Sequence, residues 1–337
     1  MVTHECCAVS STNLPMGRVE YSHVVMRVSL KNPGVQAGLA SALLFGASTP
    51  LAKPFASNFN PFLVAGLLYL GSGLGLLALR AVRGNPRLEL PASNRASLFG
   101  AVFFGGVVAP ALLMFGLSAM AASDASLLLN TEAVFTAVIA WFVFKENFDR
   151  NIVAGMVAIV AGAAILSFSG DAWRSQLLST LAVLGACLCW GIDNNLTGNV
   201  AAGDAISLAS IKGLVAGPTN LVLAVVVGAS APPAGSIAAL LVLGFVCYGL
   251  SLVLFILALR RLGTARAGAY FCVAPFFGAI LALALGAPLT WQIVVAGCLM
   301  AVGIWLHLIE NHEHEHSHGD LEHKHPHSPD VTHRHPH

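Results

Sequence analysis

Long apolar stretches separated by short polar connections fill the chain between residues 34 and 310. Each has about the 20 residues that a helix rising about 1.5 Å per residue needs to cross the hydrocarbon core of a bilayer. Transmembrane strands would be about ten residues long and strictly alternating, which these stretches are not. Helices are therefore expected, because they satisfy every backbone polar group within one segment. The ten predicted spans are approximately residues 35–54, 61–81, 96–117, 123–144, 152–168, 177–199, 205–227, 237–259, 264–285 and 291–309.

Composition supports an all-α integral membrane protein with the lipid bilayer as its surroundings. Of 337 residues, 56% are apolar and 10% are charged, against about 25% charged in a soluble domain. The mean hydropathy is +0.77. The net charge of +1 argues against a nucleic-acid partner, because domains that bind nucleic acids carry a basic excess. The seven cysteines are scattered and odd in number, so no disulfide framework is expected.

Polar segments flank the apolar region. Residues 1–33 form an N-terminal arm without the apolar core of a signal peptide, and Met16 and Met26 are alternative starts. Residues 311–337 are almost free of apolar side chains, so a disordered, solvated, His-rich tail is expected.

Basic residues predict the orientation. With a cytoplasmic N-terminus, most of them fall in inside loops, and little beyond Lys53 and Arg174 falls outside. This asymmetry is the positive-inside signal. Ten spans then place both termini in the cytoplasm, and the expected location is the bacterial inner (plasma) membrane. Trp141, Trp190 and Trp291, near predicted span ends, are expected in the interfacial aromatic belt. The inside set is Arg80, Arg83, Arg87, Arg95, Lys145, Arg150, Arg260, Arg261 and Arg266.

The two halves of the apolar region resemble each other. They are residues 34–170, with spans one to five, and residues 171–310, with spans six to ten. Because each half has an odd number of spans, the second enters the membrane upside down, as in many secondary transporters. Two inverted five-helix repeats are expected, although apolar segments rich in Gly and Ala also align by chance. Shifts of 141 or 145 residues align Ser123 with Thr264, Ala133 with Ala274, Phe135 with Phe276, Gly162 with Gly303, Gly46 with Gly191 and Leu51 with Leu196.

Two segments resemble a known family. Residues 127–166 (LLLNTEAVFTAVIAWFVFKENFDRNIVAGMVAIVAGAAIL) and residues 269–300 (AYFCVAPFFGAILALALGAPLTWQIVVAGCLM) are similar to the signature segments of EamA-type members of the drug/metabolite transporter superfamily. FGASTPLAK and WGIDNNLTGNV, which begin at Phe45 and Trp190, resemble a branch with a His-rich C-terminus. The resemblance implies the transporter fold.

The chain departs from that family pattern at two places. Val134 replaces the usual proline of the fourth span, whereas Pro275 keeps it in the ninth. The acidic position represented by Glu146 is Ala287 in the second half.

Ionisable groups inside spans are the main candidates for function, because a charge in hydrocarbon costs about 2.5–3.5 kcal/mol unless it faces a cavity or a partner. Glu132 lies near the middle of the fourth span and is a candidate proton carrier, since a low dielectric disfavours its charged form. Asp193 and Lys212 lie at similar depth on neighbouring spans, which allows either a static ion pair or a substrate role. The three are expected to line a central cavity.

Neutral polar residues complete the candidate cavity. Thr136 lies one turn after Glu132, and Asn194 and Asn195 follow Asp193 directly. Asn130 belongs to the same polar set. The asparagines serve either this cavity or interhelical hydrogen bonds.

No catalytic constellation is present, so an enzyme is not expected. The chain has no GxxxxGK[ST] or GxSxG motif, and HExxH occurs only within the alternating histidine repeat of residues 312–318. The expected function is secondary, ion-gradient-driven transport of a small metabolite or ion, with no tightly bound cofactor. The alternative is a metal-handling protein, active in efflux or sensing, whose tail is the working element. Homodimer formation stays open.

Ten of the 13 histidines lie in the tail. Neutral imidazole suits zinc, nickel, cobalt and copper, and a flexible chain can gather several of them around one ion. A pH-sensitive polycation or an expression tag are the other interpretations. The predicted metal ligands are His312, His314, His316, His318, His323, His325, His327, His333, His335 and His337.

Overall fold

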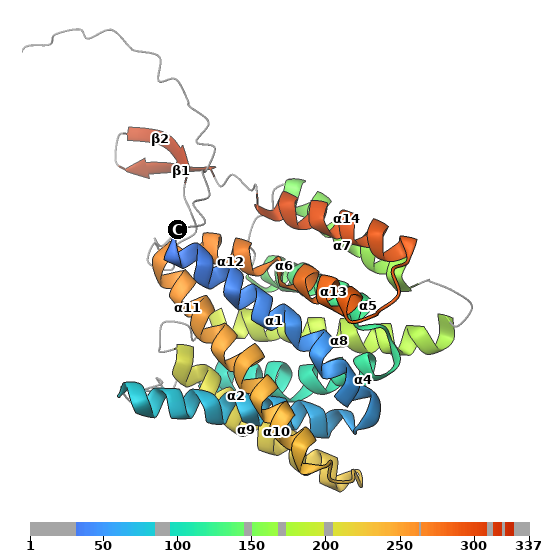
Figure 1. Ribbon diagram of the computed structural model, residues 1–337. Helices are drawn as coiled ribbons and strands as arrows, with labels where there is room; N and C mark the ends of the chain where they lie inside the picture. Colours follow the sequence, from blue (N-terminus) through green and yellow to red (C-terminus); the bar gives the residue numbers. More distant parts are fainter. Residues whose placement is uncertain are drawn as a thin grey trace, which may run out of the picture.

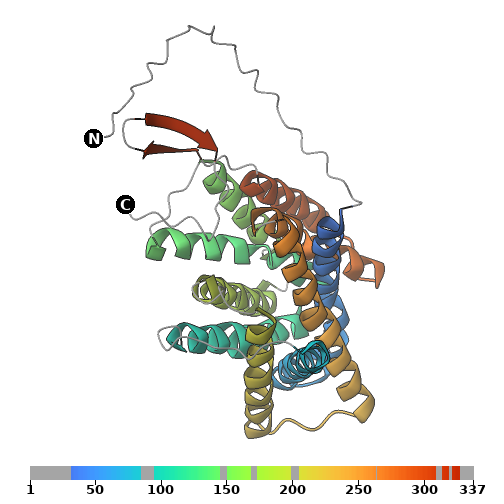
Figure 2. The same ribbon diagram turned by 90° about the vertical axis from the view of Figure 1, so that its left-hand side faces the viewer.

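The computed structural model is a bundle of helices with a short two-stranded hairpin outside it (Figures 1 and 2). The N-terminal arm before residue 32 lies outside the described residues. The structure describes residues 32–84, 95–144, 150–167, 173–198, 205–262, 264–308, 313–318 and 321–326.

The first half contains seven α-helices and one π-helix among its described residues. They are α1 (Pro33–Asn58), α2 (Pro61–Arg83), α3 (Arg95–Ala101), η2 (Val102–Val108), α4 (Ala109–Ala119), α5 (Ala122–Leu128), α6 (Thr131–Phe144) and α7 (Arg150–Ser167).

The second half contains the same kinds of element. They are α8 (Trp173–Gly198), α9 (Ala205–Val226), α10 (Ala234–Leu243), η3 (Gly244–Leu250), α11 (Ser251–Leu262), α12 (Thr264–Phe271), α13 (Ala274–Ala284) and α14 (Trp291–Leu308).

Eight helical segments of the described chain are long and apolar enough to cross a membrane, and they coincide with the first eight predicted spans. The predicted spans at residues 264–285 and 291–309 contain the shorter apolar helices Ala274–Ala284 and Trp291–Leu306. The described residues between 32 and 308 are therefore helical, as predicted, with segments long and apolar enough to cross a membrane, and the count of ten crossings stays a prediction.

Asparagine–proline pairs start the first two helices. The Asn32 side chain accepts a hydrogen bond from the backbone N–H of Gly34 at 2.8 Å, and Asn60 caps Phe62 in the same way at 2.9 Å. The proline that follows each asparagine occupies a first-turn position, where a missing N–H costs no helical hydrogen bond. These pairs fix where α1 and α2 begin.

The two halves exchange equivalent partners. Helix α2 packs on α9, and α7 packs on α14. Helix α1 packs on α11 and α13, while its counterpart α8 packs on α4 and α6, as a two-fold relation between the halves requires (Figure 1). The two π-helices obey the same relation, because η2 and η3 begin 142 residues apart, at Val102 and Gly244. The internal repeat inferred from the sequence is thus present in the packing.

Glycines allow the closest of these contacts. A Cβ atom on Gly73 of α2 would lie 2.7 Å from the backbone nitrogen of Leu214, and one on Gly213 of α9 would lie 2.7 Å from the Cα of Gly73. The two backbones therefore touch directly, without side chains between them. Residues 73 and 213 are 140 positions apart, close to the repeat shift.

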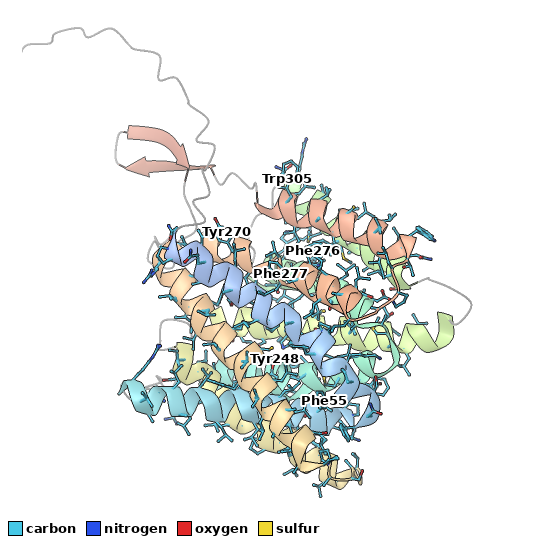
Figure 3. All side chains as sticks on the ribbon, viewed as in Figure 1. Phe55, Tyr248, Tyr270, Phe276, Phe277 and Trp305 are labelled. Carbon is cyan, nitrogen blue, oxygen red and sulfur yellow. The ribbon has the colours of Figure 1, made fainter. Side chains whose placement is uncertain are left out.

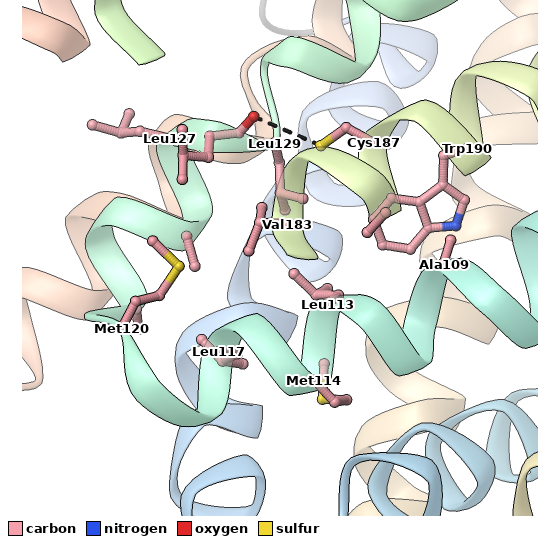
Figure 4. Packing of buried hydrophobic residues seen from close by; sticks show 14 of the residues in the cluster. Ala109, Leu113, Met114, Leu117, Met120, Leu127, Leu129, Val183, Cys187 and Trp190 are labelled. Carbon is pink, nitrogen blue, oxygen red and sulfur yellow. Dashed lines mark hydrogen bonds between the residues drawn. The ribbon is translucent and has the colours of Figure 1, made fainter. Parts of the chain in front are cut away.

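Large apolar side chains fill the spaces between the helices. Figure 4 shows Leu113 and Leu117 of α4 packed near Leu127, Val183 and Cys187, all at most 2% exposed. Trp305 instead points outward and is 59% exposed (Figure 3). Apolar groups on the outside as well as the inside are what a bundle in lipid requires.

The histidine-rich segment contributes two strands, although the sequence predicts a disordered tail. Strands β1 (Glu313–His318) and β2 (Leu321–Pro326) pair antiparallel. Histidine alternates here with other residues, and that two-residue period fits a strand. The predicted ligands His312, His327, His333, His335 and His337 lie outside the described residues.

Candidate functional site

A cavity of about 460 Å³ opens between the two halves of the bundle. Its walls include α1, α6, α7 and α8, together with α12, α13 and α14. Its polar side chains are Asn130, Glu132, Thr136 and Asn194, and aromatic rings come from Phe45 and Phe271. Four of the predicted site residues are thus gathered around one space.

The fourth span is broken beside this cavity. Helix α5 ends at Leu128, and α6 begins at Thr131 after a turn at Leu129 and Asn130. The Asn130 Nδ2 atom donates to the carbonyl of Leu127 at 3.0 Å, and the Thr131 hydroxyl donates to Leu128 at 2.7 Å. Asn and Thr side chains compete in this way with helical hydrogen bonds. The Thr131 hydroxyl thus serves the Leu128 carbonyl at the break, while the Leu127 carbonyl also accepts the backbone N–H of Asn130 at 3.0 Å.

A second break lies at the equivalent place in the ninth span. Helix α12 ends at Phe271, and α13 begins at Ala274 with Pro275 in its first turn. Proline supplies no N–H, so it starts a helix readily but cannot continue one. Both breaks contribute to the cavity wall, through Leu129 and Asn130 on one side and through Cys272, Ala274 and Pro275 on the other.

Glu132 is held by a side chain of the opposite half. Its Oε1 atom accepts a hydrogen bond from Asn194 Nδ2 at 2.8 Å, and the same Nδ2 lies 3.2 Å from Thr136 Oγ1. Asn195 donates to the carbonyls of Thr136 and Gly191 at 3.1 and 2.8 Å. Both asparagines thus make interhelical hydrogen bonds to α6, and Asn194 also lines the cavity.

Asn130 carries an orphan acceptor. It is 3% exposed, and its Oδ1 atom has no hydrogen-bond partner. Its Nδ2 atom also contacts the Met300 sulfur at 3.7 Å, besides donating to Leu127. Because the amide nitrogen already faces a carbonyl, exchanging N and O would set two oxygens against each other. Asn130, one of the residues that line the cavity, therefore keeps an unpaired amide oxygen.

Asp193 and Lys212 form a buried ion pair away from this cavity. Lys212 Nζ lies 2.7 and 2.6 Å from the two oxygens of Asp193, whose side chain is 8% exposed. The Thr197 hydroxyl donates to Asp193 at 2.9 Å. Neither Asp193 nor Lys212 lines the cavity that Glu132 lines. Successive residues of a helix point about 100° apart, so Asp193 faces η2 and α9 while Asn194 faces α6.

The π-helix η2 lies beside this ion pair, and its residue Gly105 contacts the polar side chains around it. The carbonyl of Gly105 accepts hydrogen bonds from the Tyr69 hydroxyl at 2.9 Å and from Trp190 Nε1 at 3.0 Å. A Cβ atom on Gly105 would collide with the Asp193 carboxylate, so only glycine fits there. Trp190 is 7% exposed and lies inside the bundle, so the belt prediction is wrong for it; Trp141 and Trp291 are exposed.

Sequence reasoning missed the aromatic wall and the first helix break. Phe45 and Phe271 lie with ring centroids 5.3 Å apart, on helices more than 200 residues apart in sequence. No local pattern reports such a pairing. The one sequence signal for the break is the polar run that Asn130 and Thr131 begin within a largely apolar segment, and such a run also fits an uninterrupted helix.

The described residues of the helical bundle show no metal-binding geometry. Among those residues, no group of three or more His, Cys, Asp or Glu side chains is arranged to hold an ion. The described cysteines are all free. The tail remains the one place for which the sequence predicts a metal.

Over most of its length, the chain is similar to known transporters. The model of a family described as the EamA-like transporter family matches residues 32–168 and 177–309. A protein named "Uncharacterized transporter" from Methanothermobacter thermautotrophicus is 26% identical over 289 residues, covering 80% of this chain and 84% of that protein. Purine permease 2 from Arabidopsis thaliana is 28% identical over 87 residues, 24% of each chain. One crystal structure matches with a TM-score of 0.61 at 17% identity, covering 81% of this chain and 95% of its own, and shows the fold alone.

The ion pair makes a prediction about stability. Lys212→Met leaves the Asp193 carboxylate buried without a charge partner, so the free energy of unfolding should fall by about 3–5 kcal/mol. Asp193→Asn combined with Lys212→Met should recover most of that loss. Thermal unfolding of the purified protein in detergent measures both. A single variant that melts no lower than the double variant would contradict a buried, mutually dependent pair.

Proposed function

The chain belongs to the EamA-like transporter family, and on that premise we propose that it is a secondary, ion-gradient-driven transporter of a small metabolite or ion. The observation that carries the proposal is the cavity between two broken helices, one from each half of the bundle. Broken helices around a central site between repeats are a recurring arrangement in secondary transporters. Ten membrane crossings in two inverted repeats belong to the same proposal.

Glu132 is the proposed coupling residue. It is the one carboxylate among the described residues that line the cavity, and its partner Asn194 comes from the other half. A rocking motion of the halves would therefore change the contacts of Glu132. Substrate and coupling ion would act on the same side chain.

Both termini are proposed to be cytoplasmic, in a bacterial inner membrane. The support comes from the basic residues at helix ends, such as Arg80 and Arg83 in the last turn of α2. A cysteine introduced at position 83 should react with an impermeant thiol reagent only after the cells are opened. Labelling of this cysteine in intact cells would show that the protein has the opposite orientation in the membrane.

Replacement of Glu132 tests the transport proposal. Glu132→Gln keeps the shape and removes the charge, while Asp124→Asn is a matched control because Asp124 lies in the same span but does not line the cavity. Metabolites and metals are compared in cells with and without the gene, and the compound that responds is followed into proteoliposomes. Flux should fall about tenfold or more in Glu132→Gln, as loss of a charged hydrogen bond worth about 1.5 kcal/mol predicts. Asp124→Asn should transport normally.

Two results would count against this proposal. Flux that is unchanged in Glu132→Gln would remove its coupling role. Accumulation that never exceeds equilibrium under an imposed proton or sodium gradient would argue against secondary active transport.

The tail is proposed to bind a divalent transition metal, with zinc, nickel, cobalt and copper as candidates. The register of the hairpin supports this, because His314 lies opposite His325 and His316 opposite His323. Alternate positions of a strand share one face, so these four residues belong to one face of the ladder. The second candidate function, metal handling by the tail itself, rests on the same observation.

Calorimetry on a peptide of residues 311–337 tests the tail. Zinc and nickel should bind more tightly at about pH 7.5 than at about pH 5.5, because ligation needs neutral imidazole and its ordinary pKa is about 6.5. Replacement of His314, His316, His323 and His325 by Asn should weaken binding. Equal binding at both pH values would exclude imidazole ligation. Normal metal content in cells that lack only the tail would reject the second candidate function.

A further inference from the structure

We propose that the cavity selects a small protonated amine with an apolar body. The inference rests on the transport function proposed above and names the class of substrate. It follows from which hydrogen-bonding groups of the cavity are free, which are already used, and what surrounds them.

The free positions on the carboxylate and amide groups are acceptors. Glu132 receives one hydrogen bond, from Asn194, on Oε1, and a carboxylate can accept about four. Asn130 Oδ1 is buried and receives none. An unsatisfied buried acceptor costs about 1–3 kcal/mol, so a ligand that donates to it removes that penalty. An ammonium group has up to three N–H donors and could serve both oxygens.

The side-chain amide donors near these oxygens are already engaged. Asn194 Nδ2 contacts Glu132 and Thr136, and Asn130 Nδ2 donates to Leu127. No Lys, Arg or His is among the described residues that line the cavity. Lys212 is neutralised by Asp193 through both carboxylate oxygens. A substrate carboxylate or phosphate would therefore meet Glu132 without a compensating cation.

The two helix breaks do not reverse this preference of the cavity for a cation over an anion. The N-terminus of α6 carries a partial positive charge, but Glu132 occupies its first turn and offsets that charge. At the other break, Pro275 occupies the first turn of α13 and supplies no N–H. Neither half-helix presents a strong anion site to the cavity.

The remaining wall suits an apolar body. The aromatic rings of Phe45 and Phe271 line the cavity together with the apolar side chains of Leu129, Ile152 and Ile304. Aromatic faces attract cations as well as apolar groups. A volume of about 460 Å³ lies within the range of pockets for small ligands, about 300–1,000 Å³.

Three compounds with one phenyl ring test the charge preference. Phenethylamine, which is protonated at neutral pH, is compared with neutral 2-phenylethanol and with anionic 3-phenylpropionate. Each is titrated by calorimetry into the purified full-length protein in detergent. Phenethylamine should bind about tenfold or more tightly than either analogue, as expected for a charged hydrogen bond.

Variants of Glu132 and Asn130 test whether the oxygens of these two side chains cause the preference for the amine. Glu132→Gln should weaken phenethylamine binding about tenfold and leave 2-phenylethanol unchanged. Asn130→Ala should weaken it less, and Asp124→Asn should have no effect. The melting temperature of each variant identifies any that fail to fold, and the comparison of the three compounds on the unmodified protein needs no variant.

The outcomes separate this inference from the transport proposal. Phenylpropionate binding as tight as that of phenethylamine, or a Glu132→Gln variant that keeps the amine preference, would overturn the substrate class and leave transport standing. Selective amine binding by a protein that moves no compound across proteoliposomes would support the selectivity and overturn transport.

Discussion

Backbone hydrogen bonding in hydrocarbon constrains everything else in this protein. A helix in lipid must satisfy its own N–H and C=O groups, so each interruption needs a local remedy. Four interruptions occur among the described spans, at η2, η3 and the breaks after Leu128 and Phe271. At Leu128 the remedy includes the Thr131 hydroxyl, which donates to its carbonyl, and the Cys187 thiol, whose hydrogen bond to the same carbonyl is drawn in Figure 4. At Gly105 it is Tyr69 and Trp190. The polar side chains of the bundle gather where the helices depart from regularity.

The spans could be predicted from the sequence because hydrophobic length is a local property. Only one of the two helix breaks could be predicted from the sequence. Pro275 predicts one break, because proline has no N–H and cannot continue a helix. Asn130 and Thr131 are compatible with an uninterrupted helix, and only the tertiary contacts determine that the helix breaks there. Glu132, Asn130, Thr136 and Asn194 could be nominated as intramembrane polar residues, and they meet at the cavity. Their separation from Asp193 and Lys212 depends on the rotation of α8, which a boundary uncertain by a few residues cannot specify.

The two halves share their architecture but differ in chemistry at equivalent places. The fourth span is broken by side chains that bond to carbonyls, and the ninth by a proline. Helices α1 and α11 are joined by Ser41 and Ser251, which each donate to the other's carbonyl, whereas α4 and α8 pack mainly through apolar residues. Such differences let a two-fold bundle hold a cavity with a single carboxylate. A strictly symmetric pair of halves would present two.

The glycine contact between α2 and α9 restricts how this sequence can change over evolutionary time. When two side chains collide, a protein ordinarily recovers by making the neighbour smaller. At Gly73 and Gly213 that route is closed, because each position already carries the smallest residue and faces backbone. Any substitution must be answered by a shift of two whole helices. These two positions, one in each half, are therefore expected to drift least, whereas the lipid-facing surface drifts freely.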